Sequence, residues 1–251
     1  PDGKDLSTRE QPSGPQRLLI LGWTRKVPNL LREFAAEDMA IDVVGLTPVE
    51  DRMAVLAGHR DLALDHVRQI EKDFLDPVRL TELEPSGYDQ IILLARARMG
   101  EEAHADAATI AAYLSLQHIC TGQEAQPKLF VEILEEENRS LFDSAHDVLV
   151  TPLAISYMLS QIALQRELAA IFTELSRIGG PQIALRPMQA ADYPEPVSFD
   201  TLAMHTEQRR EIALGVLTAA GEVHLNPDRG ENLAIRDGDK LVTLTTVCDL
   251  G

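Results

Sequence analysis

The chain has 251 residues, and its 40 acidic and 23 basic side chains give a formal net charge of −17 and a pI of about 4.7. Hydrophobic residues make up 45% of the chain and charged residues 25%, which is enough apolar material for one large domain or two smaller ones. Such an acidic surface repels nucleic-acid phosphates and anionic membrane leaflets, so neither is expected as a partner.

The two cysteines, Cys120 and Cys248, lie too far apart for a metal motif and are too few for a disulfide framework. They fit a reducing compartment. No segment approaches the roughly 18 apolar residues of a membrane span, and the N-terminus has no signal-peptide core. Residues 1–16 are rich in Pro, Gly, Ser and mixed charge, so we expect a flexible linker there. Because the chain starts at Pro1 rather than Met, we expect it to be a piece of a longer protein.

From residue 17 onward, short apolar runs alternate with segments of helical period. The predicted strands lie at 18–21, 41–46, 65–70, 90–95, 128–133 and 147–150. Helices are predicted after Pro28, after the Asp76-Pro77 cap, over about 101–120 and over 135–144. Strand 18–21 is apolar on both faces, which is typical of a parallel strand covered on both sides. The alternation predicts an α/β fold, a Rossmann-like doubly wound parallel sheet over 17–150.

A long helix is predicted to follow over 151–180, starting at Thr151-Pro152 and ending at Gly179-Gly180. Its apolar positions are more than one stripe needs. Two interpretations remain open: the helix packs on a second subunit, or it covers the chain's own sheet. Short strands and turns over 181–251 predict a small, β-rich α+β C-terminal lobe.

The first strand is not followed by the G-x-G-x-x-G turn of dinucleotide-binding proteins. Only Gly22 is present, followed by Trp23, Thr24 and Arg25, and this argues against NAD. The basic turn either meets an anion at the helix start or is simply solvated. After the second strand, Thr47 and Glu50 stand near the position of a ribose-binding acid, although Glu50 also suits a helix start. The candidate ligand contacts are therefore Gly22, Trp23, Thr24, Arg25, Thr47 and Glu50.

Acidic side chains follow two of the predicted strands. Asp73 and Asp76 come after the third strand, and Glu132 and Glu135 lie at the end of the fifth. Hard carboxylate oxygens are the ligands that Ca²⁺ prefers, so these four are candidate metal ligands. The alternative is that each group is a solvated acidic helix start.

The sequence contains no recognisable catalytic set. G-x-S-x-G and H-E-x-x-H are both missing, and the seven histidines are dispersed. We therefore do not expect an enzyme. A NAD(P)- or nucleotide-dependent Rossmann enzyme stays as the alternative, because this fold hosts many functions.

Several stretches, taken in order, resemble one family. They are 21–25 (Leu-Gly-Trp-Thr-Arg), 88–94, 104–107, 130–134, 148–175, 210–215 and the closing Gly-Asp-Lys-Leu within 235–242. Together they resemble the RCK (KTN) ligand-sensing domains that regulate K⁺ channels and transporters, and most of all the CASTOR/POLLUX ion-channel family. The resemblance covers almost everything after residue 16 and rests on the order and spacing of the stretches.

This resemblance implies a cytoplasmic gating-ring domain of a membrane cation (K⁺-type) channel. Such domains form dimers that build a tetrameric or octameric ring, and the ring acts on the pore-forming transmembrane region of the same protein. Ligand binding works by favouring one ring conformation over another. Members respond to Ca²⁺, Na⁺ or nucleotides; here the acidic surplus is compatible with Ca²⁺, and the glycine-poor turn disfavours NAD. A free-standing regulatory subunit of a K⁺ transporter is a further alternative.

Overall fold

The computed structural model describes residues 16–35, 37, 39–59, 62–95, 102–123, 126–142, 148–177, 179–193 and 196–246. The chain splits into two compact units, residues 1–161 and 162–251. All of the predicted linker 1–16 except Gln16 lies outside the described residues, and Gln16 already belongs to the first strand.

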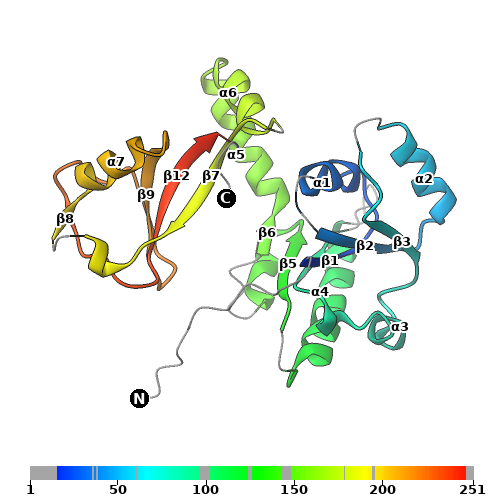
Figure 1. Cartoon of the computed structure of the whole chain (residues 1–251). Helices are drawn as coiled ribbons and strands as arrows, with labels where there is room; N and C mark the ends of the chain where they lie inside the picture. The colour runs from blue at the N-terminus through cyan, green and yellow to red at the C-terminus, as the bar shows by residue number, and fades with distance from the viewer. Residues whose placement is uncertain are drawn as a thin grey trace. The chain divides into compact units, whose positions relative to one another are not determined.

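The first unit holds a six-stranded sheet in the order β3-β2-β1-β4-β5-β6, with every described pair parallel (Figure 1). Its strands are β1 Gln16–Leu21, β2 Met39–Gly45, β3 Val67–Glu71, β4 Gln90–Leu93, β5 Lys128–Ile133 and β6 Val148–Val150. Its first helices are α1 Val27–Phe34, α2 Val49–Ala57, α3 Pro77–Thr81 and α4 Glu102–Cys120. The predicted doubly wound parallel sheet is confirmed.

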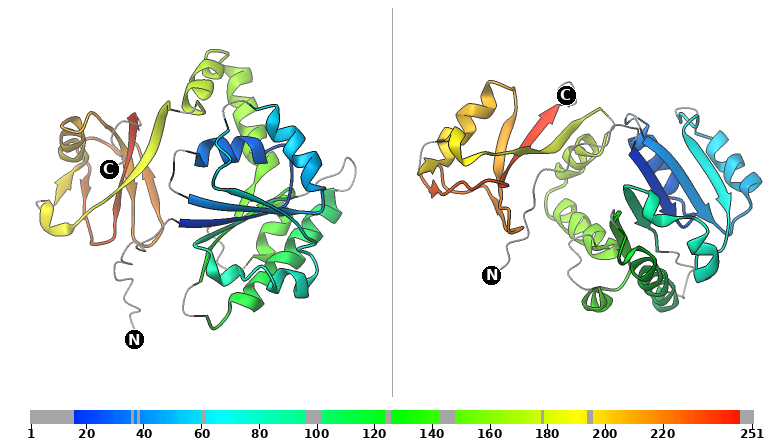
Figure 2. Two further views of the ribbon diagram at one scale, coloured as in Figure 1. Left: turned by 45° about the vertical axis from the view of Figure 1, so that its right-hand side comes forward. Right: turned by 60° about the horizontal axis from the view of Figure 1, so that its bottom comes forward.

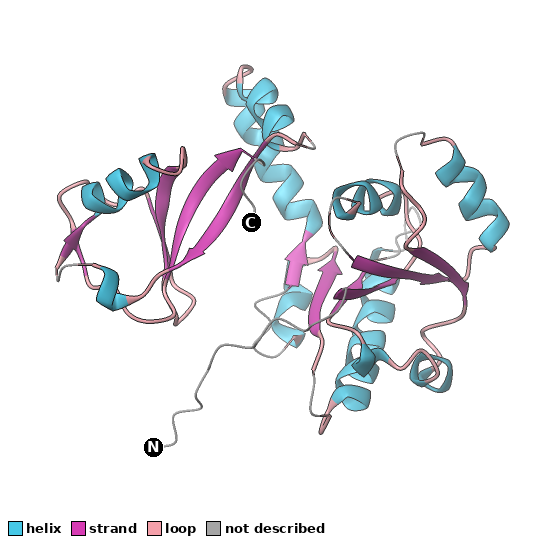
Figure 3. Cartoon of the chain, viewed as in Figure 1, coloured by secondary structure: helices cyan, strands magenta, loops and turns pink. Residues whose placement is uncertain are grey.

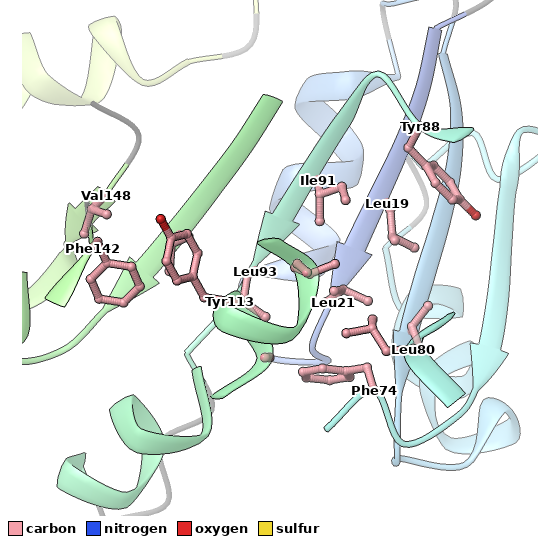
Figure 4. Packing of buried hydrophobic residues seen from close by; sticks show 14 of the residues in the cluster. Leu19, Leu21, Phe74, Leu80, Tyr88, Ile91, Leu93, Tyr113, Phe142 and Val148 are labelled. Carbon is pink, nitrogen blue, oxygen red and sulfur yellow. The ribbon is translucent and has the colours of Figure 1, made fainter. Parts of the chain in front are cut away.

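Both faces of this sheet are covered, as the left view of Figure 2 shows. Leu18 and Ile20 of β1 point into a cluster with Leu31 of α1 and Leu56 of α2. Leu19 and Leu21 belong to the cluster on the other face, built with side chains of α3 and α4 (Figure 4). Alternate residues of a strand point to opposite faces, so an unbroken apolar run is buried on both.

The 3₁₀ segments η1 Pro85–Gly87 and η2 Glu136–Leu141 complete the first sheet's connections. The sequence predicts a helix over 135–144, whereas the structure forms only the short 3₁₀ segment η2 there. Tyr113 of α4 packs on Phe142 after η2, with ring centroids 4.7 Å apart. Figure 4 shows the two rings side by side. This contact fixes the end of η2 against α4.

Two helices, α5 Thr151–Leu164 and α6 Leu168–Leu175, replace the single long helix that the sequence predicts. Between them the backbone tightens: Leu168 N donates to Gln165 O at 3.0 Å, and Ala169 N to Arg166 O at 3.2 Å. These are bonds of 3₁₀ type, which break the α-helical ladder without a proline or glycine. The apolar period runs through this turn, which is why the sequence does not reveal it.

The second unit contains a four-stranded antiparallel sheet in the order β10-β9-β12-β7. Figure 3 shows this sheet with the helix α7 beside it. The elements are β7 Pro181–Pro187, η3 Ala190–Asp192, β8 Val197–Ser198, α7 Phe199–Glu207, β9 Ile212–Leu217, β10 Val223–Leu225, β11 Asn232–Leu233 and β12 Lys240–Thr246. Phe199 and Leu202 of α7 pack with Val216 and Leu241 of the sheet. The predicted small β-rich α+β lobe is confirmed.

Candidate functional site

The carboxyl ends of the six parallel strands lie along one edge of the first sheet, the usual place for a ligand in an open α/β fold. Two groups of polar side chains occupy this edge. One surrounds Arg52 of α2 at the ends of β2 and β3. The other surrounds Glu132 of β5.

The β1–α1 turn has its glycine for a steric reason. Gly22 has a φ of +115°, which side-chain-bearing residues rarely adopt, and a Cβ there would lie 3.1 Å from Leu94 O. Its N–H donates to Val44 O at 2.9 Å. Gly22 therefore turns the chain tightly between neighbouring strands and offers no N–H to a ligand.

The first turn of α1 has already used the donors that a phosphate would need. Lys26 N donates to Thr24 Oγ1 at 3.3 Å, and Val27 N donates to Thr24 O at 3.1 Å. Pro28 has no N–H, and Asn29 N donates to Lys26 O at 3.0 Å. A pyrophosphate at a helix start relies on free N–H groups, and residues 26–29 at the start of α1 offer none.

Arg52 fills the edge above β2 and β3. Its side chain is fully buried, and its nitrogens donate to five acceptors. They are Thr47 O at 2.7 Å, Ile70 O at 3.1 Å, Val43 O at 3.2 Å, Gln69 Oε1 at 3.3 Å and Gly45 O. Burial lowers the pKa of the guanidinium, which Glu71 partly offsets. An arginine still keeps its charge, so these carbonyl ends are capped by a permanent cation.

Trp23 also covers the carboxyl edge at the ends of β2 and β3. A Cβ on Gly45 would lie 3.2 Å from the Cβ of Trp23, and the Arg52 guanidinium carbon lies 5.7 Å from the centre of the indole ring. The place where a dinucleotide would put its adenosine ribose, beyond β2, is therefore taken by the chain's own side chains. The residues present do not fit a dinucleotide.

Glu132 is the centre of the second group. Its Oε1 accepts hydrogen bonds from Lys26 Nζ, at the start of α1, and from Thr151 Oγ1, the first residue of α5. Its Oε2 is buried and has no hydrogen-bond partner. One carboxylate thus joins three elements and keeps one acceptor unused.

Asp106 of α4 holds the loop next to Glu132. Fully buried, it accepts from Leu134 N and Glu135 N, both at 2.9 Å, and from Asn138 Nδ2 at 2.8 Å. These bonds satisfy both carboxylate oxygens and tie the segment after β5 to α4. Asp106 is therefore a structural clamp.

Of the predicted ligand contacts, the structure brings Trp23 and Thr47 together around Arg52. Thr24 accepts within its own turn, and Arg25 and Glu50 are exposed. The role of these residues as ligand contacts stays a prediction.

The four predicted metal ligands do not converge. Asp73 accepts from Leu75 N at 3.1 Å, and Asp76 caps α3 through Val78 N at 2.9 Å, so both serve local turns. They follow β3, whereas Glu132 belongs to β5 and Glu135 follows it, and β5 is four strand spacings or about 19 Å from β3 in the sheet. Within the described ranges, no three His, Cys, Asp or Glu side chains are grouped to hold a metal.

Sequence reasoning missed Arg52 and Asp106. Arg52 shares a stripe of α2 with buried Leu56, and Asp106 lies beside buried Ala105 on an alanine-rich helix. A charged residue on a buried stripe was the available signal, because such a residue must find internal partners. The Lys26–Glu132 pair had no such signal, since 106 residues separate the two.

Comparison with known proteins points to ion channels. The chain is 21% identical over 253 residues to the probable ion channel SYM8 of Pisum sativum and 23% identical over 256 residues to the probable ion channel CASTOR of Oryza sativa subsp. japonica. The matches cover 85% and 86% of this chain but only 28% and 29% of the relatives. No family model matches the chain.

Solved structures show the same fold. The human SLO3 gating ring matches 92% of this chain and 44% of its own chain, with a TM-score of 0.66 and 12% identity. A GsuK channel bound to NAD matches 95% of this chain and 38% of its own, but its TM-score of 0.41 and 15% identity are too low for comparing sites.

The chain thus has the RCK gating-ring fold, as the resemblance implied, and it resembles plant ion channels in sequence. Both of these relatives carry the name of probable ion channels. No helix in the part of the chain that the structure describes is long and apolar enough to cross a membrane.

Proposed function

We propose that the chain is a ligand-sensing gating-ring domain of a membrane cation channel, of K⁺ type, that couples binding of an ion or small ligand to pore opening. The observation that carries this proposal is the match to a gating ring across both units, 92% of the chain. The sequence likeness to ion channels covers nearly the same residues.

The surface of α5 supports self-association in such a ring. The helix contains no charged residue, and every described residue of α5 is at least partly exposed. The large exposed side chains of α5 within the first unit are Leu153, Ile155, Tyr157, Met158 and Leu159. An apolar surface of this kind marks an interaction site. This favours the first of the two interpretations of the helix, contact with a second subunit, and hence a homo-oligomer.

The ligand position that we propose is the Glu132 half of the carboxyl edge. Arg52 and Trp23 fill the other half, whereas Glu132 retains an unused, buried oxygen. A cation such as Ca²⁺ suits a carboxylate better than a dinucleotide suits the β1–α1 turn. In the whole protein, the ring would act on a cytoplasmic face of the pore-forming region.

The oligomer test compares two single substitutions at equally exposed apolar side chains. Tyr157 of α5 and Val78 of α3 are each 69% exposed. Light scattering after gel filtration should give the wild type and Val78→Lys the mass of a dimer or larger ring. Tyr157→Lys should give the mass of a single chain, because a buried lysine opposes association. A wild type that stays monomeric at high concentration would count decisively against the proposal.

A further inference from the structure

Within the described residues of the first unit, one half of the sheet lacks a covering layer on one face. Ile92 of β4 pairs with Ile20 of β1 and belongs to the cluster that α1 and α2 cover. Paired residues point to the same face, so Phe130 of β5, the partner of Ile92 on its other side, shares this face. Leu149 of β6 shares it too, because it pairs with the residue two positions after Phe130. Phe130 and Leu149 are 39% and 58% exposed and define the open half of the face.

The opposite face of the same two strands is covered. Val131 and Ile133 of β5 and Val148 and Val150 of β6 are at most 8% exposed and pack in the cluster that includes side chains of α4. The exposure is therefore confined to one face of β5 and β6 and does not reflect loose packing at the sheet edge. Parallel strands normally have both faces covered, so the open half is unusual.

The helix that directly follows does not return over the open half. β6 ends at Val150 and α5 begins at Thr151, with no residue between them (Figure 1). A connection that brings a helix back onto its sheet usually takes about two to six residues. The start of α5 is also held at the carboxyl edge, because the Thr151 hydroxyl donates to Glu132. In its own chain, α5 is therefore not the cover of Phe130 and Leu149.

The surface of α5 nevertheless suits such a cover. The helix has no charged residue, and its described residues are all at least partly exposed. Successive residues of a helix are about 100° apart, so Leu153 and Tyr157 lie on the side opposite Thr151. Ile155 and Met158 share the side of Thr151. Tyr157 is 69% exposed, more than any other large apolar side chain of α5 within the first unit, and it lies on the side that faces away from the anchored start of the helix.

We propose that two copies of this chain exchange α5, so that the side bearing Leu153 and Tyr157 covers the open half of the other copy's sheet. The inference deepens the proposed homo-oligomer and rests on it. The contact is isologous, because each copy provides both the helix and the open half, and it therefore closes as a dimer with twofold symmetry. Tyr157 is the expected anchor, since a large aromatic side chain buried at the centre of an interface contributes most of the binding energy.

The area that a stable dimer needs favours this exchange over a contact between the two helices alone. A helix of 14 residues is about 21 Å long and about 10 Å across, so one side of α5 offers roughly 330 Å². A stable interface takes about 800 Å² from each partner. Contact between helices alone stays below half of that area. The exchange uses two surfaces on each copy, the helix side and the open half, and so roughly doubles the buried area.

Cysteine cross-linking of the full chain tests what covers the open half. Leu149→Cys and Tyr157→Cys are made in separate chains, which are co-expressed and then oxidised with copper phenanthroline. We expect the co-expressed pair to give a covalent dimer on a non-reducing gel, and neither variant to give it when expressed alone. The chain without added cysteines, treated alike, controls for Cys120 and Cys248.

The mass in solution provides a second measurement, by light scattering after gel filtration. Leu149→Lys should give the mass of a single chain, because the exchange would bury the lysine under α5 of the other copy. Leu149→Met stays apolar and should keep the wild-type mass. Leu225→Lys makes the matched change at a leucine of β10 that is 61% exposed, and it should keep the wild-type mass as well.

Three results would overturn the inference. If Tyr157→Cys alone forms the covalent dimer as readily as the co-expressed pair, α5 contacts α5 rather than the sheet. If the pair forms no covalent dimer, or if Leu149→Lys keeps the wild-type mass, a second copy does not cover the open half. A wild type that stays monomeric sinks the homo-oligomer proposal together with the exchange, whereas an oligomeric wild type with any of the three results sinks the exchange alone.

Discussion

The two halves of the sheet's carboxyl edge carry buried side chains of opposite charge, and their hydrogen-bond acceptors and donors are satisfied to different degrees. Over β2 and β3, the fully buried Arg52 caps the carbonyl ends with a permanent cation that has five acceptors. Over β5, the buried Glu132 shares one oxygen between two donors and leaves the other unpaired. The first half is closed by its own side chains, and the second is incomplete.

The difference separates a half that the chain's own side chains fill from a half where we propose a ligand. An arginine held by backbone carbonyls cannot leave without exposing several acceptors at once. A lysine that reaches in from solvent can be replaced at one contact. If this contrast is correct, substitutions in the closed half should affect stability alone, and substitutions in the other half should be mild and sensitive to cations.

The largest effect should come from Arg52→Met. The methionine fills part of the volume but takes the guanidinium donors away from four backbone carbonyls, so we expect a loss of about 3 kcal/mol or more in unfolding free energy. Urea denaturation measures it. The same change at the exposed Arg79 should stay within about 0.5 kcal/mol of the wild type. Equal effects at the two sites would show that Arg52 is not a cap.

The second-largest effect on the unfolding free energy should come from Glu211, whose carboxylate is held by Arg186. The hydrogen bond from Arg186 lowers its pKa from the usual 4.5, against an opposing effect of burial. A lowered pKa stabilises the fold above the unfolded value, and this contribution is lost as the pH falls below about 4.5. One proton accounts for at most about 1.4 kcal/mol per pH unit.

Urea denaturation between pH 7 and pH 3 should therefore show a shallower loss for Glu211→Gln than for the wild type. Identical slopes would mean that Arg186 does not hold the charged form, and the contrast between fixed and displaceable cations would lose its second example.

The smallest effect should come from Thr151→Val, which removes one donor to Glu132 and keeps the side-chain shape. We expect a loss of about 1 kcal/mol in unfolding free energy, the usual net value of a single hydrogen bond. Thr151→Ser retains the hydroxyl and should restore most of the stability. If the valine variant is as stable as the wild type, Glu132 does not anchor the start of α5.

The fold could be predicted further than the site. Most strands of the first sheet are visible as apolar runs, although β3, with the sequence Val-Arg-Gln-Ile-Glu, is not, and the Asp76-Pro77 cap of α3 is visible from its residues. The break between α5 and α6 was not, because the apolar period continues through the turn at 165–167. Helix α7 was also missed, although Ser198 caps its start through Thr201 N at 3.3 Å.

For the site, the sequence correctly indicated that the β1–α1 turn departs from a dinucleotide motif, because missing glycines are visible in one dimension. It did not place the four acidic candidates relative to one another. That arrangement depends on strand order, and Asp73 and Glu132 are separated by the strands between β3 and β5.

The amino-acid sequence by itself determined the alternation of elements, the two-sided burial of the strands and the loss of the glycine turn, because these depend on local period and backbone freedom. Only the tertiary structure decided which charges meet. Lys26 and Glu132 are 106 residues apart, and Arg52 finds acceptors on two neighbouring strands. Such contacts follow from strand order and helix placement, which burial over the whole unit selects and no single segment encodes.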